Sequence, residues 1–383
     1  MVRERGLVFI FMTCSVAGAA NVEYIKSCFW NHFSDTRHHV VNREYKMASK
    51  EYIYNEFTKF GLETEYFTFT DTSVSTESNF TSVVGVLKGT KFGTADDKLV
   101  GIGAHYDTVN NTKGVEDNGS GVVAMLEVAR QIADLNSKGS IRGNTVIFAA
   151  FDLEEYGIGG SFKLIRSWLN PWLARHYGED VDDLESHGVI VIDSVMFYNG
   201  TITSQCSMPG LESIFPEAYK SISSDNWKGD FLALVYRKPT PDAELAMAFI
   251  QSWEENTEKK FELESLPLPY EQFYELDGKQ QLELLNYTRS DHVNFWVNDI
   301  PAILLTDTVI FRKDINKCYH RPCDDLSVLT DDNINFLGKT ADVLTMTIHK
   351  LSDPVQDTNK ARKHTDLICS VTIMILFYSI FNI

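Results

Sequence analysis

Side chains that bind metals or transfer protons recur along this chain, several of them directly after an apolar run. The candidates are His105, Asp107, Asp117, Glu154, Glu155, Asp193 and His320. Imidazole nitrogens and carboxylate oxygens are the ligands of zinc in catalytic sites. Two ions about 3.5–4 Å apart need a bridging group, and the two oxygens of a carboxylate such as Asp117 can provide one. The set therefore predicts a metal centre with an open position for water.

The spacing of these residues also indicates the chemical role of each. Adjacent glutamates at a strand end point in different directions, so one of Glu154 and Glu155 can bind metal while the other acts as a base. Asp107 follows His105 by two residues and can accept the second imidazole N–H.

Each of these residues also has a structural interpretation that the sequence leaves open. A histidine is more often structural than a ligand, which applies to His105 and to the loop residue His320. The two glutamates could begin a helix, where the dipole favours acidic groups. Asp193 could cap a turn. The combined pattern favours the metal centre over these alternatives.

The residues must be positioned by a strand–helix–strand unit. Leu99–Ala104 and Val146–Phe151 have the length and composition of buried strands. Apolar residues at helical spacing from Val122 to Ile132 predict an amphipathic helix between them, opened by Asp117 and Asn118. The two strands should be parallel neighbours. Their carboxyl ends form the edge at which open α/β sheets bind ligands.

Apolar patterns elsewhere predict further elements of one α/β domain spanning residues 21–352. The predicted helices are Glu44–Phe60, Asp242–Phe261 (capped by Asp242) and Asp332–Leu351. The predicted strands are Glu63–Thr70 and Ser82–Leu87, as a hairpin at a sheet edge, then Val189–Ile192 and Ala302–Leu305. We expect Asn21–Val41 to be irregular and Leu263–Leu282 to be a loop, and Thr201–Lys238 has no clear assignment.

Composition bounds the classes of function. The 383-residue chain has 23% charged and 44% hydrophobic residues, which is typical of a globular protein. Its net charge of −18 argues against a nucleic-acid binder, which would need a basic face to neutralise phosphates.

The two ends of the sequence predict export and membrane attachment. Residues 1–20 combine basic Arg3 and Arg5 with an apolar core and small residues, as in a signal peptide. Residues 353–383 form a polar spacer and an apolar tail, Leu367–Ile383, which favours a GPI-attachment signal. A transmembrane anchor is the rival interpretation. We therefore expect an extracellular or cell-surface protein.

Cysteines and glycosylation motifs agree with export. Four cysteines lie between the two ends, and an even number suggests two disulfides. Cys318 and Cys323 are close enough to pair, which would leave Cys28 with Cys206, although the connectivity stays open. Glycosylation motifs occur at Asn79, Asn110, Asn199 and Asn286. A further motif at Asn118 lies within the predicted site and should be buried and unmodified.

Six runs in this order and spacing, GAHYDTV, GVEDNGSG, LEEYG, VIDS, RSDH and YHRPCDD, resemble the zinc exopeptidases of peptidase family M28. The resemblance spans roughly Leu99 to Asp325. It implies a mixed, mostly parallel sheet flanked by helices and a site with two zinc ions. The implied roles are Asp117 as bridging ligand, His105 and Asp193 on one zinc, Glu155 and His320 on the other, Glu154 as general base, and Asp107 as the acid behind His105.

Some positions depart from the family pattern or are not fixed by it. Glu116 and Gly119 stand where many members have Asp and Ala. We expect Asp291 and His292 to contact the metal ligands and hold them in place without binding the metal themselves. Tyr287 and Arg289 are candidates for contacting the substrate or stabilising the transition state.

The resemblance implies a zinc-dependent hydrolase that cleaves terminal residues from peptides with a metal-activated water. Aminopeptidase activity is favoured because an acidic site can bind a free α-amine, whereas Arg289 keeps carboxypeptidase activity open. A glutaminyl-peptide cyclotransferase with one zinc and a non-catalytic binding ectodomain are the alternatives. The intact ligand set argues against the binding ectodomain. Side-chain preference and oligomeric state are not determined by the sequence.

Overall fold

The computed structural model describes residues 19–75, 79–178, 184–271 and 278–356. The predicted signal peptide, apart from its last two residues, and the predicted apolar tail lie outside these ranges. Within the described ranges no helix combines the length and the hydropathy needed to cross a membrane.

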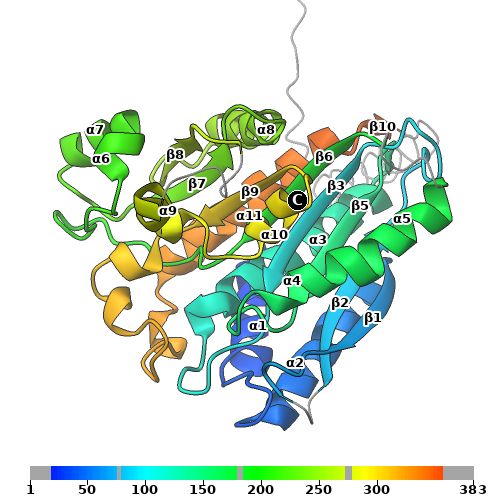
Figure 1. The fold of residues 1–383 in the computed structure, drawn as a ribbon, viewed down its shortest axis with the longest axis horizontal. Coiled ribbons are helices and arrows are strands. Elements are labelled where there is room, and N and C mark those ends of the chain that lie inside the picture. The colour runs from blue at the N-terminus through cyan, green and yellow to red at the C-terminus, as the bar shows by residue number, and fades with distance from the viewer. Residues whose placement is uncertain (1–18, 76–78, 179–183, 272–277, 357–383) are drawn as a thin grey trace, which may run out of the picture.

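The core of the fold is an eight-stranded sheet of order β1-β2-β5-β3-β6-β9-β7-β8 (Figure 1). Its strands are β1 (Glu63–Thr70), β2 (Asn79–Leu87), β3 (Leu99–His105), β5 (Val146–Phe151), β6 (Ser186–Ile192), β7 (Phe231–Arg237), β8 (Glu262–Leu268) and β9 (Ala302–Thr306). Strands β5, β3, β6 and β9 are mutually parallel, and β7 is parallel to β8. Strand β2 is antiparallel to both of its neighbours, β1 and β5, and β7 is antiparallel to β9. The predicted mixed, mostly parallel sheet is therefore confirmed.

Helices cover both faces of this sheet, and each face has its own apolar layer. One layer contains α1 (Val22–His32), α2 (Arg43–Lys59), α3 (Gly121–Ser137), α8 (Asp242–Glu255) and α11 (Asp331–Leu351). The other contains α4 (Gly159–Leu164), α5 (Asn170–Tyr177), α6 (Leu211–Ile214), α7 (Pro216–Ser224), α9 (Gly278–Leu284) and α10 (His292–Val297). A separate two-stranded sheet pairs β4 (Ser140–Arg142) with β10 (Pro354–Gln356).

The predicted strand–helix–strand unit is β3–α3–β5. Its strands are parallel neighbours, and His105 pairs in register with Phe151, so both carboxyl ends reach the same edge. Helix α3 begins at Gly121, after a turn, Val115–Ser120, whose backbone is non-helical at Asp117 and Asn118. Asn118 still caps the helix, since its Oδ1 accepts a hydrogen bond from the Gly121 N–H at 2.9 Å.

Two segments that we expected to be irregular are regular. Residues from 22 to 32 form α1, whose buried face includes Ile25 and Phe29, four residues apart and packed in the core. The acidic segment from Glu262 forms β8, an edge strand that buries alternate residues on one side. The other side of an edge strand faces water and can carry acidic residues. These acidic residues interrupt the apolar pattern from which a strand would be predicted.

Helix α8 and its expected cap also differ from the prediction. The helix ends at Glu255, before Phe261, which turns into the core. Asp242 does not cap α8. Its buried carboxylate instead accepts hydrogen bonds from the Arg237 side chain at 2.7 and 3.0 Å and from the Ala302 N–H at 3.1 Å. Asp242 thereby ties α8 to β7 and β9.

The disulfide between Cys318 and Cys323 is present, but the predicted pair of Cys28 and Cys206 is wrong. Cys28 is buried in α1, where its Sγ lies 3.2 Å from the Tyr52 hydroxyl. Cys206 lies in the loop that leads to Met208, which belongs to the apolar layer on the opposite face of the sheet. Cys28 thus belongs to one apolar layer, whereas the loop of Cys206 leads into the other.

We expect Asp242→Ala to lower the free energy of unfolding by about 3–5 kcal/mol, because it leaves the buried Arg237 guanidinium without its partner. Urea unfolding followed by circular dichroism measures the change. Exposed Glu244, in the first turn of the same helix, gives the control Glu244→Ala, for which we expect a loss under about 1 kcal/mol. Equal losses in both variants would contradict the structural role of the ion pair.

Candidate functional site

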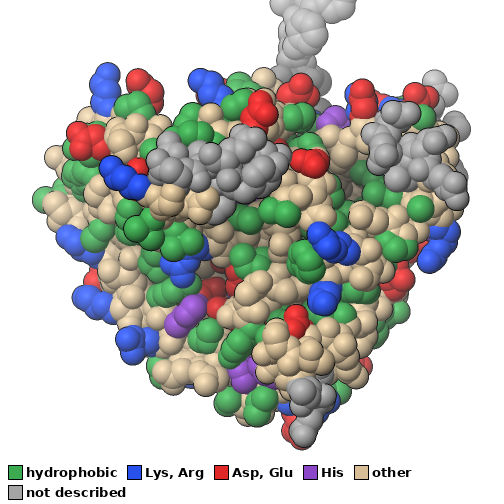
Figure 2. All heavy atoms as spheres, viewed as in Figure 1, with side chains coloured by type: hydrophobic (Ala, Val, Ile, Leu, Met, Phe, Trp, Pro, Cys, Tyr) green, Lys and Arg blue, Asp and Glu red, His purple; other side chains and the backbone are tan. Residues whose placement is uncertain are grey.

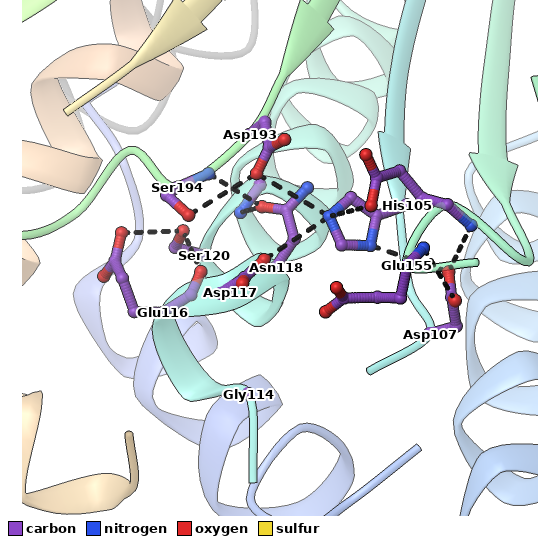
Figure 3. Close-up of polar contacts among 12 residues, drawn as sticks. His105, Asp107, Gly114, Glu116, Asp117, Asn118, Ser120, Glu155, Asp193 and Ser194 are labelled. Carbon is purple, nitrogen blue, oxygen red and sulfur yellow. Dashed lines mark hydrogen bonds and ion pairs between the residues drawn. The ribbon is translucent and has the colours of Figure 1, made fainter. Parts of the chain in front are cut away.

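The metal-binding candidates meet at the carboxyl edge of the parallel strands, where Figure 3 labels His105, Asp117, Glu155 and Asp193. His105 is the last residue of β3, Glu154 and Glu155 follow β5, and Asp193 follows β6. Asp117 comes from the turn before α3, and His320 from the loop between β9 and α11. Five segments of the chain thus converge on this edge.

The carboxylate of Asp117 lies between the two histidines. Its Oδ1 is 3.5 Å from His105 Nε2, and its Oδ2 is 3.1 Å from His320 Nε2. Asp193 Oδ1 lies 3.6 Å from His105 Nε2, and Glu155 Oε2 lies 3.1 Å from His320 Nε2. The site therefore contains two sets of donor atoms, each with one imidazole and one carboxylate, that share Asp117.

Charge and burial strongly perturb the ionisation of this cluster. Burial raises the pKa of Glu154 well above its ordinary value, and the nearby carboxylates of Asp193 and Glu155 add to this shift. Burial alone would lower the pKa of His320, but its carboxylate neighbours raise it to about 10. The pKa of Glu155 rises to about 7, mainly through burial.

The donor set fits divalent cations that accept nitrogen and oxygen ligands. Atoms of His105, Asp117 and Glu155 lie within 4.8 Å of one another. Glu155 Oε1 and His320 Nε2 are buried and form no hydrogen bond. Burying several carboxylates together is costly unless positive charge compensates them. Cations between the two histidines would supply that charge and the missing contacts.

Asp107 supports this edge in a way that its spacing did not predict. Its Oδ1 lies 3.6 Å from His105 Nδ1, on the side predicted from the sequence. Its carboxylate also accepts hydrogen bonds from the N–H groups of Glu154 and Glu155, at 3.1 and 3.3 Å. One acid therefore positions both the end of β3 and the glutamate pair after β5.

Asp324 is a site residue that the sequence analysis missed. Its two oxygens accept hydrogen bonds from the N–H groups of Glu116 at 2.7 Å and Asp117 at 3.1 Å, so it fixes the backbone that carries the shared carboxylate. The available signal was the run YHRPCDD, which contains Asp324 four residues after His320.

Two residues around Asp117 hold the Val115–Ser120 turn against β6 and the segment that follows it. Asn118 donates to the Ile192 carbonyl at 2.8 Å, and its peptide bond to Asp117 is cis. Glu116 is buried, and its Oε1 accepts hydrogen bonds from the Met196 N–H and the Ser120 hydroxyl (Figure 3). One oxygen of the longer side chain at this departure from the family pattern thus binds a backbone N–H and a side-chain hydroxyl.

His320 lies in a loop that is closed by the Cys318–Cys323 disulfide. Its φ of 57° lies in the left-handed region, which costs a non-glycine residue roughly 1–2 kcal/mol. The ring of Tyr319 stacks on the imidazole, with 3.8 Å between the ring centroids. The disulfide and this stacking restrain His320 in a conformation that it would seldom adopt in an open chain.

A cavity of about 80 Å³ opens beside the metal-binding candidates. Asp117, Glu154 and Glu155 line one side of it. Its apolar side is formed by Met208, Ala233, Val235, Leu266, Leu304, Val309, Ile310 and Phe311. Figure 2 shows acidic side chains at the bottom of a hollow in this face, with hydrophobic side chains around it. The cavity can therefore hold an apolar side chain next to the carboxylates.

Of the remaining predicted residues, Tyr287 and Arg289 line this cavity, whereas Asp291 and His292 do not. Arg289 is exposed at its rim, and its Nη2 donates to the Tyr319 hydroxyl at 3.4 Å. Tyr287 also lines the cavity, but its hydroxyl donates to the Pro209 carbonyl at 2.8 Å. His292 is buried, and its Nε2 lies 3.0 Å from the Tyr287 carbonyl, so it supports that segment. Asp291 is buried, and burial raises its pKa to about 7.

Comparison with solved structures agrees with this fold. Over 92% of its length, the chain superimposes on 78% of the Legionella pneumophila LapA aminopeptidase, with a TM-score of 0.58 and 15% identity. It also superimposes over 87% of its length on 98% of the Porphyromonas gingivalis glutaminyl cyclase, with a TM-score of 0.53 and 14% identity. At these identities the likeness shows the fold, which both kinds of protein share.

The sequence comparison is more specific. Residues 82–178 match the model of peptidase family M28, so the family resemblance is confirmed and the chain is M28-like. It is 26% identical to the uncharacterized protein YfbL of Escherichia coli, over 64% of each chain. It is also 26% identical to aminopeptidase Y of Saccharomyces cerevisiae, over 66% of this chain and 36% of that protein. The matches thus span less than two thirds of these relatives' lengths.

We expect Asp324→Asn to weaken zinc binding about 10- to 100-fold, because an amide cannot accept both N–H groups that position Asp117. Competition with a zinc-chelating dye measures the affinity. Asp325→Asn is the matched control, since that neighbouring carboxylate accepts from the Ser327 N–H instead. Unchanged affinity in Asp324→Asn would show that the two hydrogen bonds do not position the ligand.

We expect the pH dependence of stability to report the charge on His320 when a chelator is present. Its pKa of about 10 in the folded chain exceeds the unfolded value of about 6.5. Its stabilising contribution is therefore complete below pH 6.5 and disappears as the pH rises through about 10. His320→Gln should lower the melting temperature more at pH 6 than at pH 10.5.

The control for this experiment is His187→Gln, because burial lowers the pKa of that histidine. It should show no excess loss at pH 6. A loss in His320→Gln that does not change with pH would refute the assigned charge.

Proposed function

We propose that this protein is a zinc-dependent exopeptidase that releases residues from the amino end of peptides. The observation that carries the proposal is the shared carboxylate of Asp117 between two imidazole–carboxylate sets, with Glu154 beside them. Glu154 Oε2 lies 3.9 Å from His105 Nε2. Membership of the matched segment in family M28 supports the same activity.

In this proposal His105 and Asp193 would hold one zinc, His320 and Glu155 would hold the other, and Asp117 would contribute to both sets of ligands. Bound zinc would acidify a water molecule and polarise the scissile carbonyl. Glu154 takes the proton from the attacking water and delivers it to the leaving amine. Burial and neighbouring carboxylates raise the pKa of Glu154, which suits a group that must accept and return a proton.

The preference for the amino end is supported by the charges around the cavity. A free α-amine is positive, and it would lie next to the carboxylates of Asp117 and Glu155, which line the cavity. The apolar wall would accept the side chain of the residue being released. A carboxypeptidase would need a cation for the terminal carboxylate, and Arg289 at the rim is the residue that could supply one.

We also propose that the protein acts outside the cell, attached to the membrane through a lipid added near its carboxyl end. The signal-peptide and tail patterns support this location. Release from intact cells by a phosphatidylinositol-specific phospholipase tests it, and retention after that treatment would favour a transmembrane tail.

We expect Glu154→Gln to reduce kcat by about 10²- to 10⁴-fold while retaining zinc, because the variant loses the proton acceptor and keeps the predicted ligands. Hydrolysis of aminoacyl amides and the zinc content are measured together. Glu155→Gln is the matched variant, and we expect it to lose zinc as well as activity.

The same preparation distinguishes the alternatives. Cyclisation of an N-terminal glutamine peptide without amide hydrolysis would replace the proposal with a cyclotransferase. Hydrolysis that requires a free α-carboxylate would indicate a carboxypeptidase. If the wild-type chain binds no zinc and hydrolyses none of these substrates, the result would favour the non-catalytic binding ectodomain.

A further inference from the structure

A second cavity, of about 220 Å³, lies between α2 and the sheet, outside the proposed zinc centre. Helix α2 contributes Arg43, Lys46 and Lys50, and the floor contains Tyr106 and Asp152 from the ends of β3 and β5. The volume far exceeds the roughly 10–15 Å³ that one water molecule needs. The cavity is therefore large enough for a small polyatomic ion and its waters.

The three basic residues lie on one face of α2, since they are spaced by three and four positions. Lys46 is 6% exposed and its Nζ forms an ion pair with Asp152. Asp152 is the one acidic residue among those lining this cavity within the described ranges. The cavity therefore holds three cations and one carboxylate, an excess of two positive charges.

Asp152 has little capacity left to neutralise the other two cations. Besides Lys46, its carboxylate accepts hydrogen bonds from the Thr81 N–H at 2.8 Å and the Tyr106 hydroxyl at 3.1 Å. All these donors lie at the floor of the cavity. Asp152 therefore serves to hold Lys46 in place beneath the open space.

Arg43 and Lys50 have no ion-pair partner among the described residues. Arg43 is exposed at the mouth, and Lys50 is half-buried with its Nζ 4.9 Å from the centre of the Tyr66 ring. Burial lowers the pKa of Lys50, and the nearby Lys46 contributes to this shift. The charges of Asp152 and Glu51 partly oppose this shift. In a chain with net charge −18, no carboxylate of the described residues forms an ion pair with either cation.

We propose that this cavity binds a dianionic oxyanion, as found in phosphate and sulfate groups. Two negative charges match the excess charge of the cavity, and a tetrahedral group can accept hydrogen bonds from Arg43 and Lys50 at once. His39 lines the same space and offers a further polar contact. The group is either a free ion or an ester carried by a peptide.

Isothermal titration of the zinc-loaded protein with sodium sulfate tests the proposal, with sodium chloride as the reference salt. We expect one saturable site that weakens at least tenfold in the double variant Arg43→Gln/Lys50→Gln. Lys50→Arg keeps the charge and should retain binding.

The double variant Lys138→Gln/Lys350→Gln removes the same charge from two other helix ends and should bind like wild type. No saturable binding by wild type would overturn the proposal. Undiminished binding by Arg43→Gln/Lys50→Gln would also overturn it, because the anion would then occupy another place such as the zinc centre.

Displacement of sulfate then identifies the source of the group. Displacement by inorganic phosphate but not by a phosphoserine peptide assigns a free ion. Tighter displacement by the peptide assigns an esterified group on a peptide. Failure of both to displace sulfate would contradict the assignment to phosphate-like oxyanions.

Discussion

The architecture of this protein depends on one buried carboxylate. Asp117 lies between two histidines from segments that are far apart in sequence, and each of its oxygens approaches a different imidazole. Such a carboxylate cannot be held by its own side-chain rotamer alone. The turn that carries it is fixed by Asp324 through two backbone N–H groups and by Asn118 through the Ile192 carbonyl. The supporting groups are therefore as much a part of the site as the ligands.

The sheet provides the constraint that makes this convergence feasible. Parallel strands β5, β3 and β6 end at the same edge, so residues that follow them must gather there. The same edge continues to β2 and α2, where the cationic cavity lies. Acidic and basic clusters thus occupy neighbouring parts of one edge, separated by Asp107 and Asp152, which anchor a glutamate pair and a lysine respectively.

Much of the fold followed from local patterns, because buried parallel strands are continuous apolar runs and amphipathic helices repeat with a period near 3.6. The strands β3, β5, β6 and β9 and the helices α2 and α11 were predicted in this way. Segments whose burial depends on distant partners were missed. Helix α1 is stabilised by packing of its buried face in the core, and β8 is an edge strand with one solvent-exposed side. The pairing of Cys28 with Cys206 failed because sequence does not reveal which face of the sheet a cysteine occupies.

The sequence by itself determined which residues could form a metal centre, because their chemical types and their positions after apolar runs are local properties. The motif runs also indicated the resemblance to peptidase family M28, whose model matches residues 82–178. Only the tertiary structure decided which atoms face each other, since distances between His320, Asp117 and Glu155 depend on how loops from different strands pack. It likewise decided the roles of Asp324 and Asp242, whose partners are backbone and side-chain groups brought close by folding. The excess charge of the second cavity arises in the same way, because ion pairing is a property of neighbours in space.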